Sequence, residues 1–184
     1  MYIIIGGSSD LAKDIVKNLV KEDDIILTYN TKIKFNYIKS SKHKVYYDKL
    51  DLNNLKSIKN FIKKRSKILK NIKFLNLATL TIDKLIHDID IKDINKIFNI
   101  NYFSNIILAK ELLPLMIKQN YGKFIFFTST RAARGDKGIS LYSSSKESLS
   151  AFSKCLAKEY AQFNITSNCI KLGYFKTKLF NNIS

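Results

Sequence analysis

The 184-residue chain is poor in the residue types that build disulfide frameworks and metal sites. It has two cysteines, Cys155 and Cys169, and two histidines, His43 and His87, which lie far apart in sequence. We expect both cysteines to be reduced core residues rather than a disulfide, which fits a cytoplasmic protein. No cluster with metal-ligand spacing is visible, so the sequence predicts no bound metal.

Long apolar runs are also missing. No stretch approaches the roughly 20 residues that span a membrane. The N-terminus enters a strand-like segment at once, without the basic-then-apolar pattern of a secretion signal. A chain of 184 residues is long enough to bury one real core. We therefore expect a single domain over residues 1–184, located in the cytoplasm and not in a membrane.

Acidic residues are scarce relative to basic ones. The chain has 15 aspartates and glutamates against 32 lysines and arginines, which gives a formal net charge of +17. Such an excess can indicate nucleic-acid binding. The excess, however, is lysine spread through every segment, and the densest stretch, 56–70, has the apolar stripe of an amphipathic helix with a solvated basic face. We therefore expect no specific nucleic-acid partner. A basic nucleic-acid-binding module ranks behind two other interpretations of the chain, which are given below.

Strand-like and helix-like patterns alternate along the whole chain. We expect strands near residues 2–5, 25–29, 44–47, 72–77, 123–129 and 165–171. We expect helices near 11–21, 53–69, 93–118 and 141–161, a shorter one within 32–41, and a kink or an end at Pro114, the only proline. This alternation is typical of an α/β protein with a Rossmann-type, doubly wound parallel sheet and helices on both faces. The carboxyl ends of the strands would then share one edge, where ligands bind.

A glycine-rich turn joins the first expected strand to the first expected helix. Tyr2-Ile-Ile-Ile5 is followed by Gly6-Gly-Ser-Ser-Asp10 and then by apolar residues at helical spacing. This is the geometry of a dinucleotide site, because bare backbone can approach a pyrophosphate at the positive end of a helix. Of the spacing G-x-x-x-G-x-G only Gly6 is kept, with Asp10 and Ala12 in the other two places. A plain strand-to-helix turn is the alternative.

The most informative pattern is Tyr142-Ser-Ser-Ser-Lys146, with Ser129 thirteen residues upstream. A tyrosine and a lysine four apart share one face of a helix. A nearby ammonium would lower the pKa of the phenol, which makes Tyr142 a candidate acid/base. Ser129 could hold a substrate oxygen. Taken alone, the pair is better explained as an incidental one on a surface helix, and only its context favours a catalytic role.

These segments, in this order, resemble the short-chain dehydrogenase/reductase family from Met1 to about Thr177. Residues 6–12 look like its glycine motif, and residues 76–79 look like a worn form of its Asn-Asn-Ala-Gly motif. Residues 124–129 look like the strand that ends in the catalytic serine, and residues 172–177 look like the segment beside the nicotinamide. The resemblance implies an oxidoreductase that moves a hydride between a nicotinamide and a carbonyl or alcohol substrate.

The resemblance also implies roles for individual residues. Tyr142 would be the general acid/base, Ser129 would bind the substrate oxygen, and Lys146 would hold ribose hydroxyls and assist Tyr142. Asn101 matches the asparagine that anchors a water in a proton relay with this lysine. The catalytic set implied is Asn101, Ser129, Tyr142 and Lys146, and the cofactor set is Gly6, Ser8, Ser9, Asp10, Leu11, Asn30, Asp51, Leu52, Asn76, Ala78, Tyr142, Lys146, Gly173 and Thr177.

The end of the second expected strand indicates which nicotinamide is preferred. An acidic residue there would bind the ribose 2′-hydroxyl of NAD and repel a 2′-phosphate. The sequence reads Asn30-Thr31-Lys32 instead, with no acid. Asn30 or Thr31 could bond a phosphate and Lys32 could neutralise it. We therefore favour NADP(H) over NAD(H), although Lys32 could be one more surface lysine.

The chain also departs from the family pattern. Two motif glycines are replaced, and the chain stops at Ser184, soon after the segment beside the nicotinamide. We therefore expect the usual C-terminal lid and last strand to be absent. The alternative function is a catalytically inactive, truncated domain that binds a nucleotide or a partner protein. The helices at 93–118 and 141–161 resemble a pair that often forms a subunit contact in the family, which is compatible with a homo-oligomer.

Two of the three arginines, Arg131 and Arg134, follow Ser129 closely. They could contact an anionic group of the substrate at the mouth of a cleft. Solvated loop arginines are an equally good interpretation, so we do not place them among the site residues.

Overall fold

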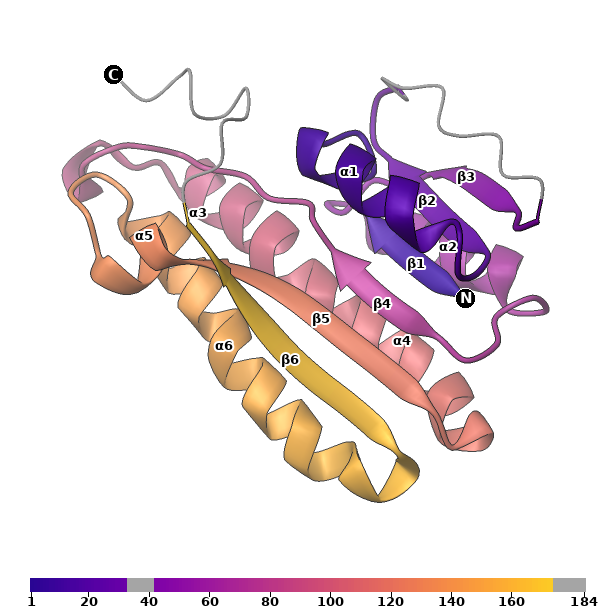
Figure 1. The fold of residues 1–184 in the computed structure, drawn as a ribbon. Coiled ribbons are helices and arrows are strands. Elements are labelled where there is room, and N and C mark those ends of the chain that lie inside the picture. Colours follow the sequence, from indigo (N-terminus) through magenta and orange to yellow (C-terminus); the bar gives the residue numbers. More distant parts are fainter. Residues whose placement is uncertain (33–41, 174–184) are drawn as a thin grey trace.

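The structure is a computed structural model, and it describes residues 1–32 and 42–173. The short helix expected within 32–41 and the cofactor residue Thr177 lie outside the described residues. The strands are β1 Tyr2–Ile5, β2 Ile25–Tyr29, β3 Val45–Lys49, β4 Lys73–Asn76, β5 Gly122–Ser129 and β6 Ile165–Leu172 (Figure 1). The α-helices are α1 Asp10–Leu19, α2 Leu55–Arg65, α3 Ile91–Phe98, α4 Ser104–Gln119, α5 Thr130–Arg134 and α6 Ser140–Tyr160. Single turns lie at Ile86–Asp88 and Ala161–Phe163, and a π-helical turn spans Asn99–Phe103.

The six strands form one parallel sheet in the order β3-β2-β1-β4-β5-β6. The predicted Rossmann-type α/β fold is therefore confirmed. The order reverses between β1 and β4, and a sheet of this kind binds ligands at the carboxyl ends of its strands beside such a reversal. In register, Ile5 lies beside Asn76, Asn76 beside Phe126, and Ser129 beside Leu172. The site residues predicted after β1, β4 and β5 consequently share one edge.

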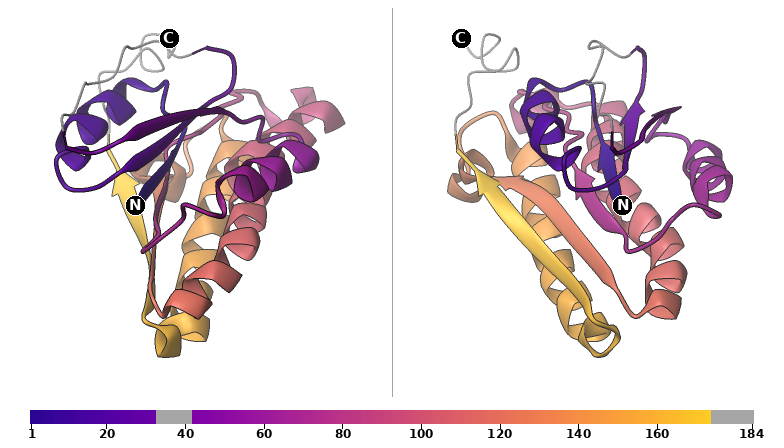
Figure 2. Two further views of the ribbon diagram at one scale, coloured as in Figure 1. Left: turned by 90° about the vertical axis from the view of Figure 1, so that its right-hand side faces the viewer. Right: turned by 45° about the vertical axis from the view of Figure 1, so that its right-hand side comes forward.

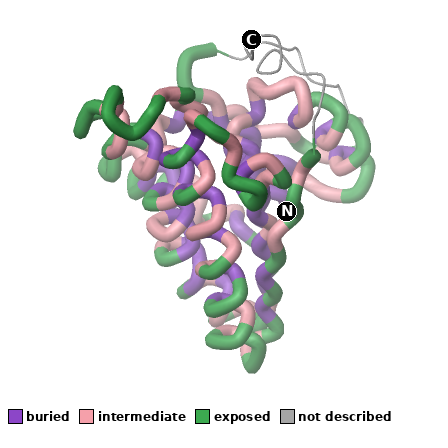
Figure 3. The backbone as a smooth tube through the Cα atoms, turned by 90° about the vertical axis from the view of Figure 1, so that its left-hand side faces the viewer, coloured by how far each residue is buried: buried purple, intermediate pink, exposed green. Residues whose placement is uncertain are grey.

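Helices cover both faces of the sheet. Among the described helices, α1 covers one face, and α2, α4 and α6 cover the other (Figures 1 and 2). Alternate strand residues supply the two cores, because successive side chains of a strand point to opposite faces. Ile3 and Ile5 pack on the side of α2 and α4, whereas Tyr2 and Ile4 pack on the side of α1. Figure 3 shows buried residues through the middle of the molecule and exposed ones in the loops and on the outward faces of the helices.

The helix expected at 93–118 is divided in the structure. It consists of α3, the π turn Asn99–Phe103 and α4, and α4 continues past Pro114 to Gln119. The expected end at Pro114 is therefore wrong, and the irregularity lies a few turns earlier. A π turn inserts one extra residue per turn and is frequent at functional sites. Here it contains the candidate residue Asn101.

The stretch Ile91–Gln119 is long and apolar enough to cross a membrane by length and composition. Its apolar residues nevertheless have partners inside the fold, since Leu108, Leu112 and Met116 lie in the core between the sheet and α2 and α6. We therefore describe it as a core helix. Of the two cysteines, both of which are free thiols, Cys169 is half-buried and Cys155 is exposed. The prediction that both are core residues is thus wrong for Cys155.

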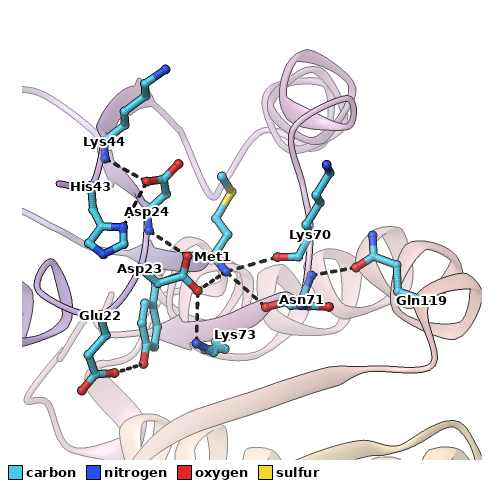
Figure 4. A network of polar contacts seen from close by, with 11 residues as sticks. Met1, Glu22, Asp23, Asp24, His43, Lys44, Lys70, Asn71, Lys73 and Gln119 are labelled. Atoms are coloured by element: carbon cyan, nitrogen blue, oxygen red, sulfur yellow. Dashed lines mark hydrogen bonds and ion pairs between the residues drawn. The ribbon is translucent and has the colours of Figure 1, made fainter.

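An ion network joins the amino ends of β1 and β4, at the sheet edge opposite the candidate site (Figure 4). The Met1 ammonium and Lys73 Nζ both donate to Asp23 Oδ2, the latter at 3.1 Å. Met1 also donates to the carbonyl oxygens of Lys70 and Asn71. Burial raises the pKa of Asp23, but the hydrogen bonds from Met1 and Lys73 outweigh it, so the net pKa lies below 3.8. The charged carboxylate therefore stabilises the fold.

Replacing Asp23 with asparagine is expected to lower the free energy of unfolding by about 1 kcal/mol at pH 7, since the site is partly exposed. Because the folded pKa of Asp23 is lowered, its stabilisation is present above the unfolded value near 3.8 and is lost as pH falls through the folded pKa. Urea unfolding at pH 7 and at pH 3 measures this, and the difference between wild type and variant should shrink at pH 3. The exposed Asp14, replaced in the same way, should change stability little at either pH. Equal effects of the two substitutions would contradict the network's role.

Candidate functional site

The glycine-rich turn packs tightly against the loop that follows β4. Gly6 has φ +80°, a left-handed conformation that favours glycine. A Cβ atom at Gly6 would lie 2.6 Å from the backbone nitrogen of Ala78, and one at Gly7 would lie 2.3 Å from Leu27 Cγ. Thr28 holds the turn from the neighbouring strand, because its carbonyl oxygen accepts from Gly7 N at 2.7 Å. The turn thus presents bare backbone at the N-terminus of α1, which fits the phosphates of a dinucleotide.

The two serines of the turn make local hydrogen bonds. Ser9 is the N-cap of α1, and its hydroxyl accepts from Ala12 N at 3.1 Å. Ser8 donates its hydroxyl to the carbonyl oxygen of Lys32 at 3.0 Å, which ties the end of β2 to the turn. Asp10 occupies the first turn of α1, where a carboxylate is favoured by the helix dipole. Lys32 is therefore fixed beside the turn, near the N-terminus of α1.

Ser129 and Tyr142 lie near each other, since the Ser129 hydroxyl is one of the groups that lower the pKa of the Tyr142 phenol. Ser129 ends β5 and caps α5, with its hydroxyl accepting from Arg131 N at 3.2 Å. Burial raises the pKa of Tyr142, and the Asp83 carboxylate acts in the same direction. The hydrogen bond to Ser129 and the Arg131 charge lower it, but the net shift is upward. The expected lowering of this pKa is therefore not found.

Lys146 is buried, and its ammonium is bonded to a backbone carbonyl oxygen. Its Nζ donates to the carbonyl oxygen of Phe127 at 2.9 Å. Burial lowers the pKa of Lys146 to about 8, because a charged ammonium loses its hydration inside the protein. Lys146 is thus held by the end of β5, one turn along α6 from Tyr142.

Asn101 links three segments from inside the π turn. Its side-chain oxygen accepts from Leu80 N at 2.8 Å, and its Nδ2 donates to Leu80 O at 2.9 Å and to Ser145 Oγ at 3.0 Å. Ser145 in turn donates to the carbonyl oxygen of Tyr142 at 2.8 Å. Asn101 is fully buried. It therefore fixes the loop after β4 against the turn of α6 that holds the candidate acid/base.

Asn105 extends this network to β4, and sequence reasoning missed it. Its Nδ2 donates to the carbonyl oxygen of Asn101 at 2.8 Å, and its Oδ1 accepts from Asn76 Nδ2 at 2.7 Å. The Asn76 side-chain oxygen accepts from Ala78 N, which shapes the loop against which Gly6 packs. A signal was available, since Asn105 lies four positions after Asn101, on the same helical face, and is followed by the apolar run Ile106–Ala109. Ser145 and Asp83 were missed as well.

Replacing Asn105 with alanine should lower the free energy of unfolding by about 2 kcal/mol, because it removes the side-chain partner of a buried amide. The Asn76 amide loses its acceptor, and the carbonyl oxygen of Asn101 loses the hydrogen bond from the Asn105 side chain. Chemical denaturation measures the loss, with alanine at Asn95, an exposed asparagine of α3, as the control. A loss no larger than that of the control would show that the network contributes nothing to stability.

The remaining predicted cofactor residues follow other strands. Asn30 is exposed at the end of β2, while Asp51 and Leu52 are half-buried just after β3. The Asp51 carboxylate accepts from Asn53 N at 2.9 Å and so shapes the local turn. Gly173 follows the end of β6. In the sheet order, Asn30 and Asp51 lie on the β2–β3 side of the glycine turn, and Ser129 and Gly173 lie on the other side.

Comparison with known proteins agrees with this geometry. The family profile described as short chain dehydrogenase matches residues 1–184. The chain belongs to the short-chain dehydrogenase/reductase family. A 3-oxoacyl-[acyl-carrier-protein] reductase FabG of Buchnera aphidicola subsp. Baizongia pistaciae is 31% identical over 99% of the chain and 76% of its own length. Carbonyl reductase family member 4 of Xenopus laevis is 29% identical over 96% of the chain and 75% of its own length.

Solved structures of this short-chain dehydrogenase/reductase fold superpose closely on the chain. A short-chain dehydrogenase from Streptomyces avermitilis has a TM-score of 0.88 at 23% identity, covering 97% of the chain and 68% of that structure. ElxO with NADP bound has a TM-score of 0.84 at 22% identity, covering 98% of the chain and 75% of that structure. At this identity the likeness concerns the fold. It places the sheet and its carboxyl edge in the arrangement found in short-chain dehydrogenases.

Proposed function

We propose that this chain is an NADP(H)-linked reductase of a small carbonyl substrate, with Tyr142 as the proton donor. The observation that supports it most is that the buried Tyr142 phenol lies close enough to Ser129, at the carboxyl edge of the sheet on the β5 side of the glycine turn, for the Ser129 hydroxyl to lower its pKa. Family membership supports the coarser statement of an oxidoreductase. The names of two relatives, an oxoacyl reductase and a carbonyl reductase, favour a carbonyl substrate.

The residues of the site suit the reduction of a carbonyl to an alcohol. The nicotinamide, when bound, supplies the hydride to the carbonyl carbon. Ser129 donates a hydrogen bond to the carbonyl oxygen, and Tyr142 gives that oxygen its phenolic proton. Because burial raises the pKa of Tyr142, the phenol keeps its proton near neutral pH, which suits the reductive direction. Lys146 and Asn101 hold the carboxyl end of β5 and the Tyr142 turn of α6 in place.

The residues around the glycine turn fit a dinucleotide phosphate. Close packing of Gly6 on Ala78 leaves backbone where a side chain would otherwise lie. Gly6, Ser8, Ser9, Asp10 and Leu11 would hold the pyrophosphate at the N-terminus of α1. Lys32, tied to the turn through Ser8, would neutralise a 2′-phosphate. The Asp10 carboxylate weakens this site, since it adds a negative charge near the phosphates.

Direct titration of the purified chain with NADPH and NADH tests the proposal. We expect saturable binding with tighter affinity for NADPH. Replacing Lys32 with alanine should reduce the preference about two- to fivefold, the effect of one exposed charge pair. Alanine at the exposed Lys67, which follows α2, is the control and should leave the preference unchanged. Tighter binding of NADH would refute the preference, and no binding by a folded sample would favour the alternative of a catalytically inactive domain that binds a partner protein.

A further inference from the structure

Asn105 is a buried amide on a helix face that is otherwise apolar further along. Its side chain is 1% exposed, and Leu108 and Leu112, which follow it on the inward face of α4, belong to the apolar core. Burying an amide costs free energy unless its hydrogen bonds are made, so an apolar residue of similar size would fill this place at lower cost. What the amide adds is direction, because its oxygen and its nitrogen bond to different segments.

The oxygen of Asn105 is bonded toward the glycine turn. Asn105 Oδ1 accepts from Asn76 Nδ2 at 2.7 Å, and Asn76 Oδ1 accepts from Ala78 N at 2.9 Å. Ala78 is the backbone against which Gly6 packs, since a Cβ atom at Gly6 would lie 2.6 Å from its nitrogen. The place of the glycine turn therefore depends on Asn105 through one intervening side chain, that of Asn76, which is itself only 3% exposed.

The nitrogen of Asn105 is bonded toward the candidate acid/base. Asn105 Nδ2 donates to the carbonyl oxygen of Asn101 at 2.8 Å. Asn101 Nδ2 donates to Ser145 Oγ at 3.0 Å, and Ser145 Oγ donates to the carbonyl oxygen of Tyr142 at 2.8 Å. Asn101 and Ser145 have no exposed surface. The turn of α6 that holds Tyr142 therefore depends on Asn105 through two buried side chains.

We propose that Asn105 is a positioning residue that fixes the glycine turn and the Tyr142 turn relative to each other. As far as it concerns NADPH affinity and turnover, this proposal rests on the proposed function. A nucleotide bound at Gly6 and a carbonyl oxygen bound at Tyr142 react only when their separation is right, and a misplacement of about 1 Å can cost about 10²-fold in rate. Asn105 acts on the reaction through Asn76 and Asn101.

Hydrogen exchange tests this positioning without any nucleotide or turnover. The amides of Ala78 and Leu80 each donate to a side-chain oxygen of the network, at 2.9 and 2.8 Å, so they report its two arms. In Asn105→Ala both amides should exchange at least about tenfold faster by NMR, because their acceptors lose a fixed position. Asn105→Leu fills the space and removes only the hydrogen bonds, so it should accelerate the same two amides. It also serves if the alanine variant does not fold.

Ser167→Ala is the matched control, since it too breaks a buried side-chain hydrogen bond. Ser167 Oγ and Ser153 Oγ lie 2.8 Å apart between β6 and α6. Ser167 lies beside Phe124, five residues before Ser129 on β5 and so about 16 Å from it along the strand. The control should leave the Ala78 and Leu80 amides near their wild-type rates. It also corrects for exchange through global unfolding, which any loss of stability would raise.

The outcomes separate positioning from packing and from the proposed function. Wild-type exchange of both amides in Asn105→Leu, or equal acceleration in the Ser167 control, would overturn the proposal. If the two amides respond but the wild-type chain neither binds NADPH nor reduces a carbonyl, the positioning role stands and the proposed function fails. If the wild-type chain does both, folded Asn105→Leu should bind NADPH more weakly and have a lower kcat than the control. Wild-type values of both quantities in that variant would also overturn the proposal.

Discussion

Phenylalanine at position 142 is expected to lower carbonyl reduction by about 10²- to 10⁴-fold, the usual contribution of a positioned general acid. The phenol oxygen is the group that Ser129 contacts, and the substitution removes it while keeping the aromatic ring. Tyr142 is 9% exposed and packs against Ile97, Ala132 and Ile139, so the ring itself maintains the local core. Affinity for NADPH should change little, because the glycine turn lies on another part of the sheet edge. Steady-state kinetics with NADPH and a panel of ketones would measure the loss.

A control on the same helix separates chemistry from packing. Tyr160 lies at the far end of α6 and packs on Phe163. Phenylalanine there should leave turnover within about twofold, since surface substitutions away from special features cost little. Wild-type turnover by the Tyr142 variant, with the control also active, would refute the role of Tyr142. Loss of turnover together with loss of NADPH binding would instead point to a disturbed fold.

The fold was largely predictable because each element has a local signal. The buried run 2–5, the alternation after it and the strand 123–129 are encoded by apolar periodicity, and the structure places strands there. The division of the helix expected at 93–118 into α3, a π turn and α4 was not predictable from apolar periodicity. Its π turn depends on Asn101 bonding Leu80 and Ser145, residues 21 and 44 positions away. The proline, a strong local signal, misled because α4 continues through it.

The sequence led us to expect Ser129 and Tyr142 close together, but it did not predict the electrostatics around them. Ser129 ends an expected strand and Tyr142 lies on the helix that follows it. Their spacing in the sequence was therefore enough to predict that the two side chains lie close together. The orientation of Lys146 could not be foreseen, because it depends on the Phe127 carbonyl oxygen and on burial that lowers the pKa of the amine. Arg131 was set aside on sequence grounds as a loop residue. Only the fold shows that Asp83, 48 positions earlier, pairs with its guanidinium.

Alanine at position 6 should weaken NADPH binding by at least about tenfold, which corresponds to about 1.4 kcal/mol. Gly6 combines a φ of +80° with a backbone neighbour, and the added methyl would lie 2.6 Å from Ala78 N and 2.9 Å from Ala78 Cα. Neither neighbour is a flexible side chain, so the turn or the loop after β4 must shift. The backbone offered to the phosphates would shift with it. Calorimetric titration with NADPH and urea unfolding would measure both consequences.

Gly135 provides the matched control, because it has nearly the same backbone conformation without the close neighbours. Its φ is +75°, and a Cβ there would meet nothing within 4 Å. Alanine at Gly135 should therefore cost only the left-handed strain of about 1–2 kcal/mol in stability and leave NADPH affinity unchanged. The Gly6 variant should lose more stability than the control, and it alone should lose affinity. If both variants lose the same stability and bind NADPH equally well, the contact with Ala78 does not shape the nucleotide site, and Gly6 is needed only for its backbone conformation.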